Sequence, residues 1–256
     1  MSSNQCYLSE VYSAIQGEGP LVGVRQIFVR FSACDLRCIW CDTPDSLVRQ
    51  EFCEMEDIAG SRSSQKIKNP ITLSQLISYI KQLEPAIHHS ISLTGGEPLL
   101  QSNFLVSFLP TIKKEVNLPI YLESGGHRPS ELKSIVQYLD YISMDFKLPS
   151  SSKTSDMWDK HYDFLSLSLE ANKQVWVKIV LTNLTLYEEL LRSLDVVKSV
   201  NKKNNKKTEI FLQPVTQING SKPPSEAQLL NIQSKLLCVY PRIRVVPQVH
   251  RLIGQK

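Results

Sequence analysis

The segment Phe28-Val-Arg-Phe-Ser-Ala-Cys34-Asp-Leu-Arg-Cys38-Ile-Trp-Cys41-Asp-Thr43 combines an apolar run with three closely spaced cysteines. Residues 26–31 have the composition of a buried strand, so the cysteines, spaced C-x3-C-x2-C, would lie on the loop directly after it. Three thiolates this close together can hold three irons of a 4Fe–4S cubane and leave the fourth iron open to a small ligand. Cys34, Cys38 and Cys41 are therefore the predicted cluster ligands.

A structural zinc site is the main alternative for these cysteines, and three unrelated thiols on one loop are the other. Zinc usually takes four protein ligands, often as two close pairs. Here the next cysteine is Cys53 and the first histidine is His88. The remaining cysteines, Cys6, Cys53 and Cys238, are scattered along the chain, and we expect them to be isolated thiols without a role.

Outward from this segment, short apolar runs alternate with longer segments of helical period. The expected strands are 26–31, 90–94, 119–123, 141–145, 175–181, 209–213 and 242–246, and the expected helices are 72–83, 102–115, 129–138, 156–172, 185–201 and 225–239. Continuous apolar runs are typical of strands buried on both faces of a parallel sheet. Repeated β-then-α order predicts right-handed crossovers, and hence an α/β fold built as a barrel or as an open doubly wound sheet.

The composition gives few reasons to expect a membrane or nucleic-acid partner. The 256 residues suit one domain, within which we expect 51–69 to be an inserted surface loop and the lysine-rich 202–207 a solvated loop. The net charge of +4 is mild. No apolar run approaches the roughly 18 residues of a membrane span, and residues 1–10 lack the pattern of a secretory signal. We therefore expect a cytoplasmic protein.

A second candidate site is Thr94-Gly95-Gly96-Glu97-Pro98, which follows an expected buried strand and precedes an expected helix. Two glycines let the backbone approach a ligand without Cβ clashes. The exposed amides and carbonyls can bind the amino group and carboxylate of an amino acid, while Glu97 can accept a hydrogen bond from an ammonium or orient the loop. An ordinary β-to-α turn is the alternative, and the cysteine triad favours the binding site over it.

Together, C-x3-C-x2-C and Gly-Gly-Glu-Pro resemble the radical S-adenosylmethionine superfamily. The resemblance implies a partial, open (β/α) barrel with its site at the carboxyl ends of the strands. It implies a 4Fe–4S cluster with S-adenosyl-L-methionine on its open iron. The residues that it places beside this cofactor are Gly95, Gly96, Glu97, Ser124, Asp145, Phe146, Lys147, Gln213 and Thr216.

The segment Ile15-Gln16-Gly17-Glu18-Gly19 is interpreted as a tight loop that lies near Arg30. Its glycines are not a dinucleotide fingerprint, because a strand rather than a helix follows them. An amide, a carboxylate and a guanidinium can together grip a ligand that has donor and acceptor edges and a carboxylate. A fork-shaped guanidinium suits that carboxylate, and a pterin-like ring presents such edges.

With this segment the resemblance narrows to the 7-carboxy-7-deazaguanine synthase family, on matches that also include 123–125, 145–147, 213–214 and 248–252. The resemblance implies a lyase that converts 6-carboxy-5,6,7,8-tetrahydropterin to 7-carboxy-7-deazaguanine with loss of ammonia, a step of queuosine biosynthesis and so of a tRNA modification pathway. It implies Mg²⁺ on Thr43. The implied substrate contacts are Ile15, Gln16, Gly17, Glu18, Arg30, Thr94 and His250.

The resemblance also implies a homodimer and an electron donor such as flavodoxin or ferredoxin. Two other functions stay open at this point. A glycyl-radical-enzyme activase would share the cysteine spacing but should lack the set formed by Gln16, Glu18 and Arg30. A zinc-bearing, non-enzymatic binding module would contain one zinc instead of iron. The carboxylate of Lys256 is a further candidate for the site.

Overall fold

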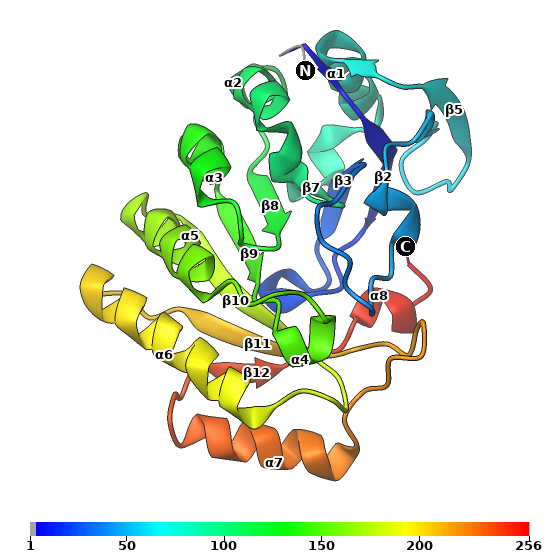
Figure 1. Cartoon of the computed structure of the whole chain (residues 1–256). Helices are drawn as coiled ribbons and strands as arrows, with labels where there is room; N and C mark the ends of the chain where they lie inside the picture. The colour runs from blue at the N-terminus through cyan, green and yellow to red at the C-terminus, as the bar shows by residue number, and fades with distance from the viewer. Residues whose placement is uncertain (1–3, 256) are drawn as a thin grey trace.

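The computed structural model describes residues 4–255, and its main feature is a sheet of ten strands in the order β12-β11-β10-β9-β8-β7-β3-β2-β4-β5. Seven neighbouring strands are parallel: β3 (Arg25–Phe31), β7 (Ser90–Gly95), β8 (Ile120–Ser124), β9 (Tyr141–Asp145), β10 (Gln174–Leu181), β11 (Glu209–Pro214) and β12 (Ile243–Val245). The sequence predicts these seven to within one residue at each end. Because β12 and β5 are the two edges, the sheet is open, as the partial-barrel expectation requires (Figure 1).

Six longer helices confirm the six that the sequence predicts. They are α1 (Leu73–Gln82), α2 (Ser102–Val116), α3 (Pro129–Ile135), α5 (Trp158–Glu170), α6 (Tyr187–Asn204) and α7 (Glu226–Leu237), and they cover one face of the fan-shaped sheet (Figure 1). Two short helices, α4 (Pro149–Ser152) and α8 (Val249–Leu252), were not predicted. Single 3-10 turns occupy Gly19–Leu21, Pro44–Leu47, Pro85–Ile87, Pro98–Gln101 and Val136–Tyr138.

The carboxyl end of α6 corrects one expectation. Lys202 and Lys203 belong to its last turn and not to a solvated loop. Cations are favourable at a helix carboxyl end, where they complement the helix dipole, so two lysines there extend the helix instead of ending it. Within residues 4–255, no helix is long and apolar enough to cross a membrane.

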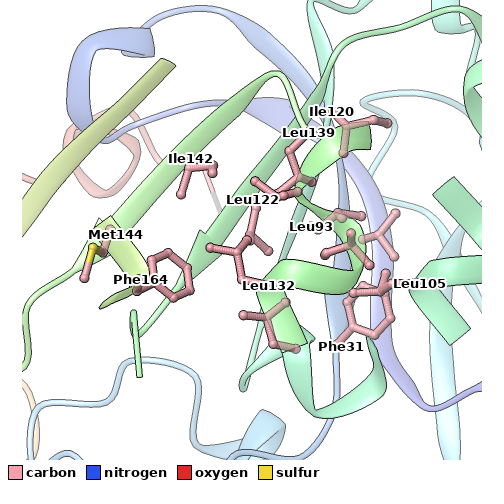
Figure 2. Close-up of a cluster of buried hydrophobic side chains, with 14 of the residues drawn as sticks. Phe31, Leu93, Leu105, Ile120, Leu122, Leu132, Leu139, Ile142, Met144 and Phe164 are labelled. Carbon is pink, nitrogen blue, oxygen red and sulfur yellow. The ribbon is translucent and has the colours of Figure 1, made fainter. Parts of the chain in front are cut away.

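The main hydrophobic core lies between the sheet and the covering helices. Alternate residues of the parallel strands point into it, among them Leu93, Leu122 and Ile142 (Figure 2). They meet helix residues that include Leu105 and Phe164. Burying one such side chain contributes about 1.5–3 kcal/mol, so this layer fixes the strands that carry the site.

The opposite face of the sheet differs from the continuous apolar surface that the sequence predicts. Its floor is a small apolar cluster of Tyr121, Trp176 and Phe211. Two residues further along the same three strands stand Glu123, Lys178 and Gln213. Because side chains two apart in a strand share a face, the floor is followed by a polar layer toward the carboxyl ends of the strands.

The rest of the sheet comes from the N-terminal part of the chain and from segment 51–69. Strand β2 (Leu8–Ile15) runs antiparallel to β3, and β4 (Phe52–Glu56) pairs with β2. The segment expected to be an inserted surface loop holds β4 and β5 (Ser64–Lys68), a hairpin that extends the sheet. Cys53 and Met55 are buried and anchor β4, whereas β5 is mostly exposed. A separate pair is formed by β1 (Gln5–Cys6) and β6 (Ile71–Thr72).

Candidate active site

A cavity of about 200 Å³ on the polar face of the sheet gathers nearly all of the predicted site residues. It joins segments from both ends of the chain with the carboxyl ends of the parallel strands. The predicted residues that line it are Ile15, Gln16, Gly17, Glu18, Arg30, Cys34, Cys38, Cys41, Thr43, Thr94, Gly95, Gly96, Glu97, Ser124, Asp145, Lys147, Gln213, Thr216 and His250.

Phe146 is the candidate that the structure does not bring to the cavity. Asp145 ends β9 with its side chain in the cavity, so strand alternation turns Phe146 toward the helices. There its ring is buried and stacks on His161 of α5, with the ring centroids 4.4 Å apart. Phe146 is therefore a core residue. Lys256 lies outside the described residues.

The three clustered cysteines are free thiols that open onto the same cavity. Their loop is fixed by backbone hydrogen bonds from Cys34 N to Leu47 O (3.2 Å) and from Ile39 N to Ser152 O (3.2 Å). Burial raises the pKa of the Cys34 thiol to about 11 and also raises that of Cys38. Thiolates in this environment need a compensating positive charge, which bound iron supplies.

An iron–sulfur cluster and a zinc ion require different arrangements of their protein donors. Within residues 4–255, no three His, Cys, Asp or Glu side chains converge on a point where they could hold a single metal ion. A structural zinc site needs such convergence. The thiolates of a cubane each bind a different iron and can therefore stand apart around it. Cys34, Cys38 and Cys41 line one cavity, which is the arrangement that the predicted cluster needs.

The glycine-rich loop is attached directly to the cysteine loop. Gly96 N donates to Phe31 O and Glu97 N donates to Ala33 O, both at 2.9 Å. The Glu97 carboxylate, which is 1% exposed, accepts hydrogen bonds from Leu99 N, Ser124 Oγ and Gly125 N. Of the two roles open to Glu97, the structure supports the orientation of the loop.

Lys178 lines the cavity but was not predicted from the sequence as a site residue. Its Nζ lies 2.6 Å from Glu18 Oε2 and 3.3 Å from Asp145 Oδ2. Gln213 and Gln248 donate to the other oxygen of Glu18. Burial opposes the ionisation of Glu18, but the Lys178 ammonium, the nearby His250 and the hydrogen bond from Gln248 lower its pKa to about 2. Glu18 is thus a permanent carboxylate at neutral pH.

Asp145 offers a ready acceptor to a ligand in the cavity. Its Oδ2 accepts from Lys147 Nζ at 2.8 Å, whereas its Oδ1 is buried without a hydrogen-bond partner among residues 4–255. An unsatisfied buried oxygen costs roughly 1–3 kcal/mol. A ligand that donates a hydrogen bond there would remove this cost, which fits the predicted cofactor site.

A second polar group joins the N-terminal loop to β7 and β8. Gln16 Nε2 donates to Gln26 Oε1 and to Glu123 Oε1, and Thr94 Oγ1 donates to Glu123 Oε2, all at 2.9 Å. Burial and the nearby Glu18 charge raise the pKa of Glu123. The neighbouring Arg30 donates from Nε to Glu10 Oε1 (2.7 Å) and from Nη2 to the Tyr12 hydroxyl (2.5 Å). The cavity therefore presents a fixed guanidinium beside the Gln16 amide, the Glu123 carboxyl group and the Thr94 hydroxyl.

The C-terminal segment closes against these loops. Val249 N donates to Gly17 O at 3.0 Å, and a Cβ at Gly17 would lie 2.3 Å from His250 Nδ1, so only glycine fits there. Gln248 accepts from Thr216 and donates to Asp42 Oδ2 at 2.9 Å. Asp42, Glu123 and Gln248 were not predicted as site residues, although each lies within or beside a segment that carries the family resemblance.

His161, buried beneath the site, is expected to make the fold sensitive to acid. Its Nε2 lies 3.2 Å from Gly125 O, and burial lowers its pKa to about 4 from an ordinary value near 6.5. Between these values the unfolded chain binds a proton that the folded chain does not, so stability falls as pH falls. The shift corresponds to about 3 kcal/mol.

Replacing His161 by phenylalanine should make the fold less sensitive to acid. Between pH 7 and pH 4, we expect the free energy of unfolding to fall by less in this variant than in the wild type, as measured by urea denaturation of the cluster-free chain. An equal fall in the free energy of unfolding of both proteins over this pH range would contradict the prediction.

Comparison with known proteins agrees with this geometry. The model of the radical SAM superfamily matches residues 28–216. The chain is 36% identical to the 7-carboxy-7-deazaguanine synthase of Geobacter sulfurreducens over 100% of both chains. It is 32% identical to that of Archaeoglobus fulgidus, over 96% of this chain and 97% of the relative.

Among solved structures, QueE from Escherichia coli matches with a TM-score of 0.61 and 19% identity, over 95% of this chain and 94% of that one. This likeness confirms the fold, an open (β/α) partial barrel. The full-length relatives favour the synthase over the activase and the zinc module that the sequence left open. The chain therefore belongs to the radical SAM superfamily and, within it, to the 7-carboxy-7-deazaguanine synthase family.

Proposed function

We propose that this enzyme converts 6-carboxy-5,6,7,8-tetrahydropterin to 7-carboxy-7-deazaguanine and ammonia, a carbon–nitrogen lyase step of queuosine biosynthesis. The observation that carries the proposal is that Arg30, Gln16 and Thr94 line the same cavity as the three cysteines. A substrate held by the first group would lie next to a cofactor held by the second. The names of the full-length relatives support the same reaction.

The residues on the substrate side suit a carboxylated pterin. Arg30, fixed by Glu10 and Tyr12, would pair with the substrate carboxylate. Gln16 and Thr94 would face the donor and acceptor edges of the ring, with Glu123 behind them. Ile15, Gly17, Glu18 and His250 would complete the enclosure. Such a rigid frame would expose one carbon of the ring to hydrogen abstraction.

On the cofactor side, the cluster and S-adenosyl-L-methionine supply, when bound, the radical chemistry of the superfamily. Cys34, Cys38 and Cys41 would hold the cluster. The residues that would position S-adenosyl-L-methionine are Gly95, Gly96, Glu97, Ser124, Asp145, Lys147, Gln213 and Thr216. Their task is orientation, because misplacing a reacting atom by an ångström costs on the order of a hundredfold in rate.

Thr43 is the proposed Mg²⁺ ligand. Its Oγ1 lies 3.9 Å from Cys41 Sγ, and the residue lines the cavity. A hydroxyl is a hard oxygen ligand, and Mg²⁺ keeps much of its shell as water and substrate. We also propose that the chain is a single domain that works as a homodimer in the cytoplasm, reduced by a donor such as flavodoxin or ferredoxin.

Anaerobic reconstitution with iron and sulfide tests the function. Reductant, Mg²⁺, S-adenosyl-L-methionine and 6-carboxytetrahydropterin are then added, and the products are read by mass spectrometry. We expect a species lighter than the substrate by one ammonia, and less of it when Mg²⁺ is omitted. Accumulation of 5′-deoxyadenosine alone would overturn the substrate but keep the radical chemistry. One zinc per chain in place of iron would overturn both.

Replacing Arg30 by glutamine is expected to lower kcat/KM for the pterin about a hundredfold. The change removes a desolvated partner of the substrate carboxylate, a loss of about 3 kcal/mol. Arg25→Gln is the matched control, because Arg25 is on the same strand but contacts Ser13 and Ala59 outside the cavity. Equal kcat/KM values for the two variants would contradict the role of Arg30.

A further inference from the structure

We propose that His127 is a positioning residue that ties the cysteine loop to the glycine-rich loop and thereby sets where the cluster sits relative to S-adenosyl-L-methionine. Its side chain does not line the cavity, and no sequence motif points to it. The inference rests on the cluster and S-adenosyl-L-methionine of the proposed function and is independent of the pterin substrate.

On one side, His127 holds Asp35, which stands between two of the cluster ligands in the chain. His127 Nε2 lies 2.9 Å from Asp35 Oδ1 and 3.0 Å from Oδ2. The next residue, Arg128, donates from Nη2 to Asp35 Oδ2 at 2.7 Å. Two consecutive residues after β8 thus bind one carboxylate of the cysteine loop. Hydrogen bonds to a charged group are stronger than those between neutral groups.

On the other side, the same imidazole faces Glu97 of the glycine-rich loop. His127 Nδ1 lies 3.9 Å from Glu97 Oε2, and this nitrogen is buried with no hydrogen-bond partner among residues 4–255. The distance is too long for a hydrogen bond, so the contact is electrostatic and steric. Ser124, at the end of β8, and Gly125, in the loop that carries His127, donate to Glu97. The ring therefore sits between the two loops that hold cluster and cofactor.

The contact of His127 reaches a part of the cysteine loop that the backbone bonds from the glycine-rich loop do not. The backbone bonds from the glycine-rich loop end at Phe31 and Ala33, before the first cluster ligand. Asp35 lies beyond that ligand, so its contacts with His127 and Arg128 hold the segment between Cys34 and Cys38, which the backbone bonds of Cys34 and Ile39 fix only at its ends. Partners one layer outside a metal site typically change affinity or activity 10- to 100-fold when lost.

His127→Leu tests the proposal on the reconstituted full chain. Without pterin present, we expect cleavage of S-adenosyl-L-methionine to fall roughly 10- to 100-fold. The EPR signal of the reduced cluster on addition of S-adenosyl-L-methionine should change. The reduction potential should become more negative, because the Asp35 charge is then less compensated and local charge and hydrogen bonds set cluster potentials.

Two further variants separate positioning from folding. A glutamine amide nitrogen reaches about where His Nε2 stands, so His127→Gln should restore most of the cleavage rate and the EPR signal. Asp35→Asn should reproduce the loss of cleavage and the change of the EPR signal, but not the more negative potential, because it removes the charge itself. The double variant should cleave S-adenosyl-L-methionine no worse than either single change, as expected for residues that act on one another. Additive defects would overturn the proposal.

His88→Leu is the matched control, since it removes another buried histidine that is bonded to Ser13 Oγ and Glu84 O away from the cavity. It should lower stability without moving the EPR signal or the potential. If His127→Leu leaves both unchanged, or if His88→Leu shifts them equally, the role of His127 is merely structural. Because no readout uses pterin, a wrong substrate would leave this result unaffected.

Discussion

Replacing Lys178 by methionine is expected to abolish product formation and to lower the free energy of unfolding by about 3–5 kcal/mol. The Lys178 ammonium lies 2.6 Å from the buried Glu18 carboxylate and 3.3 Å from Asp145. Its removal leaves the Glu18 carboxylate, among the described residues, with the neutral donors Gln213 and Gln248. Glu18 would then take up a proton or draw in water, and the cavity would lose its fixed charge. Urea denaturation and product analysis measure the two effects.

Lys203→Met supplies the control for this prediction, because it breaks an exposed pair with Glu170 whose atoms are also close, at 2.8 Å. Exposed ion pairs contribute about 0–1 kcal/mol, so the same substitution should cost little there. Adding Glu18→Gln to Lys178→Met should recover much of the stability but not the activity, since the uncompensated charge is gone. Equal losses in the two lysine variants would show that the buried network does not stabilise the fold.

The seven parallel strands could be predicted because each is marked by a pattern of neighbouring residues in the sequence. Strands such as β7 and β8 are buried by helices on one face, and their apolar runs end at glycine or polar residues that start the next helix. Strand β2 was missed since Glu10 and Ser13 interrupt its pattern. Strand β5 was missed because it is polar and mostly exposed at the sheet edge. Strand β5 pairs with its neighbour β4, and β2 pairs with β3 and β4, so both owe their strand structure to pairing and not to an apolar pattern of their own.

The site was predictable where spacing or a motif carries the chemistry, as for the cysteines and the glycine-rich loop. Lys178 and Glu123 were missed because their strands were interpreted as apolar on both faces. A charged residue inside an otherwise apolar strand was the available signal, since such a residue is buried only with a partner. Phe146 was wrongly included because it stands between Asp145 and Lys147, although alternation turns it to the core. His127 left no sequence signal, because its partners Asp35 and Glu97 come from two other loops.

Replacing Gly96 by alanine is expected to lower the iron content and to reduce the cleavage of S-adenosyl-L-methionine at least a hundredfold. A Cβ at this position would lie 2.1 Å from Ala33 O and 2.5 Å from Ser46 O, both backbone atoms flanking the cysteine segment. Such contacts force the two loops apart, and a shift of about an ångström between reacting groups costs on the order of a hundredfold. The crowding should also cost about 1–3 kcal/mol of stability.

Gly220→Ala separates crowding from the general cost of losing a glycine. Gly220 has a φ of +79°, and a Cβ there would meet no atom of residues 4–255 within 4 Å. Alanine at this position therefore costs about 1–2 kcal/mol of backbone strain and displaces no neighbour. Iron content and cleavage should stay at wild-type levels in this variant. Iron analysis, cleavage assays and urea denaturation of both variants decide the matter. If Gly96→Ala binds iron and cleaves S-adenosyl-L-methionine like Gly220→Ala, the two loops are not in the tight contact from which the cofactor geometry follows.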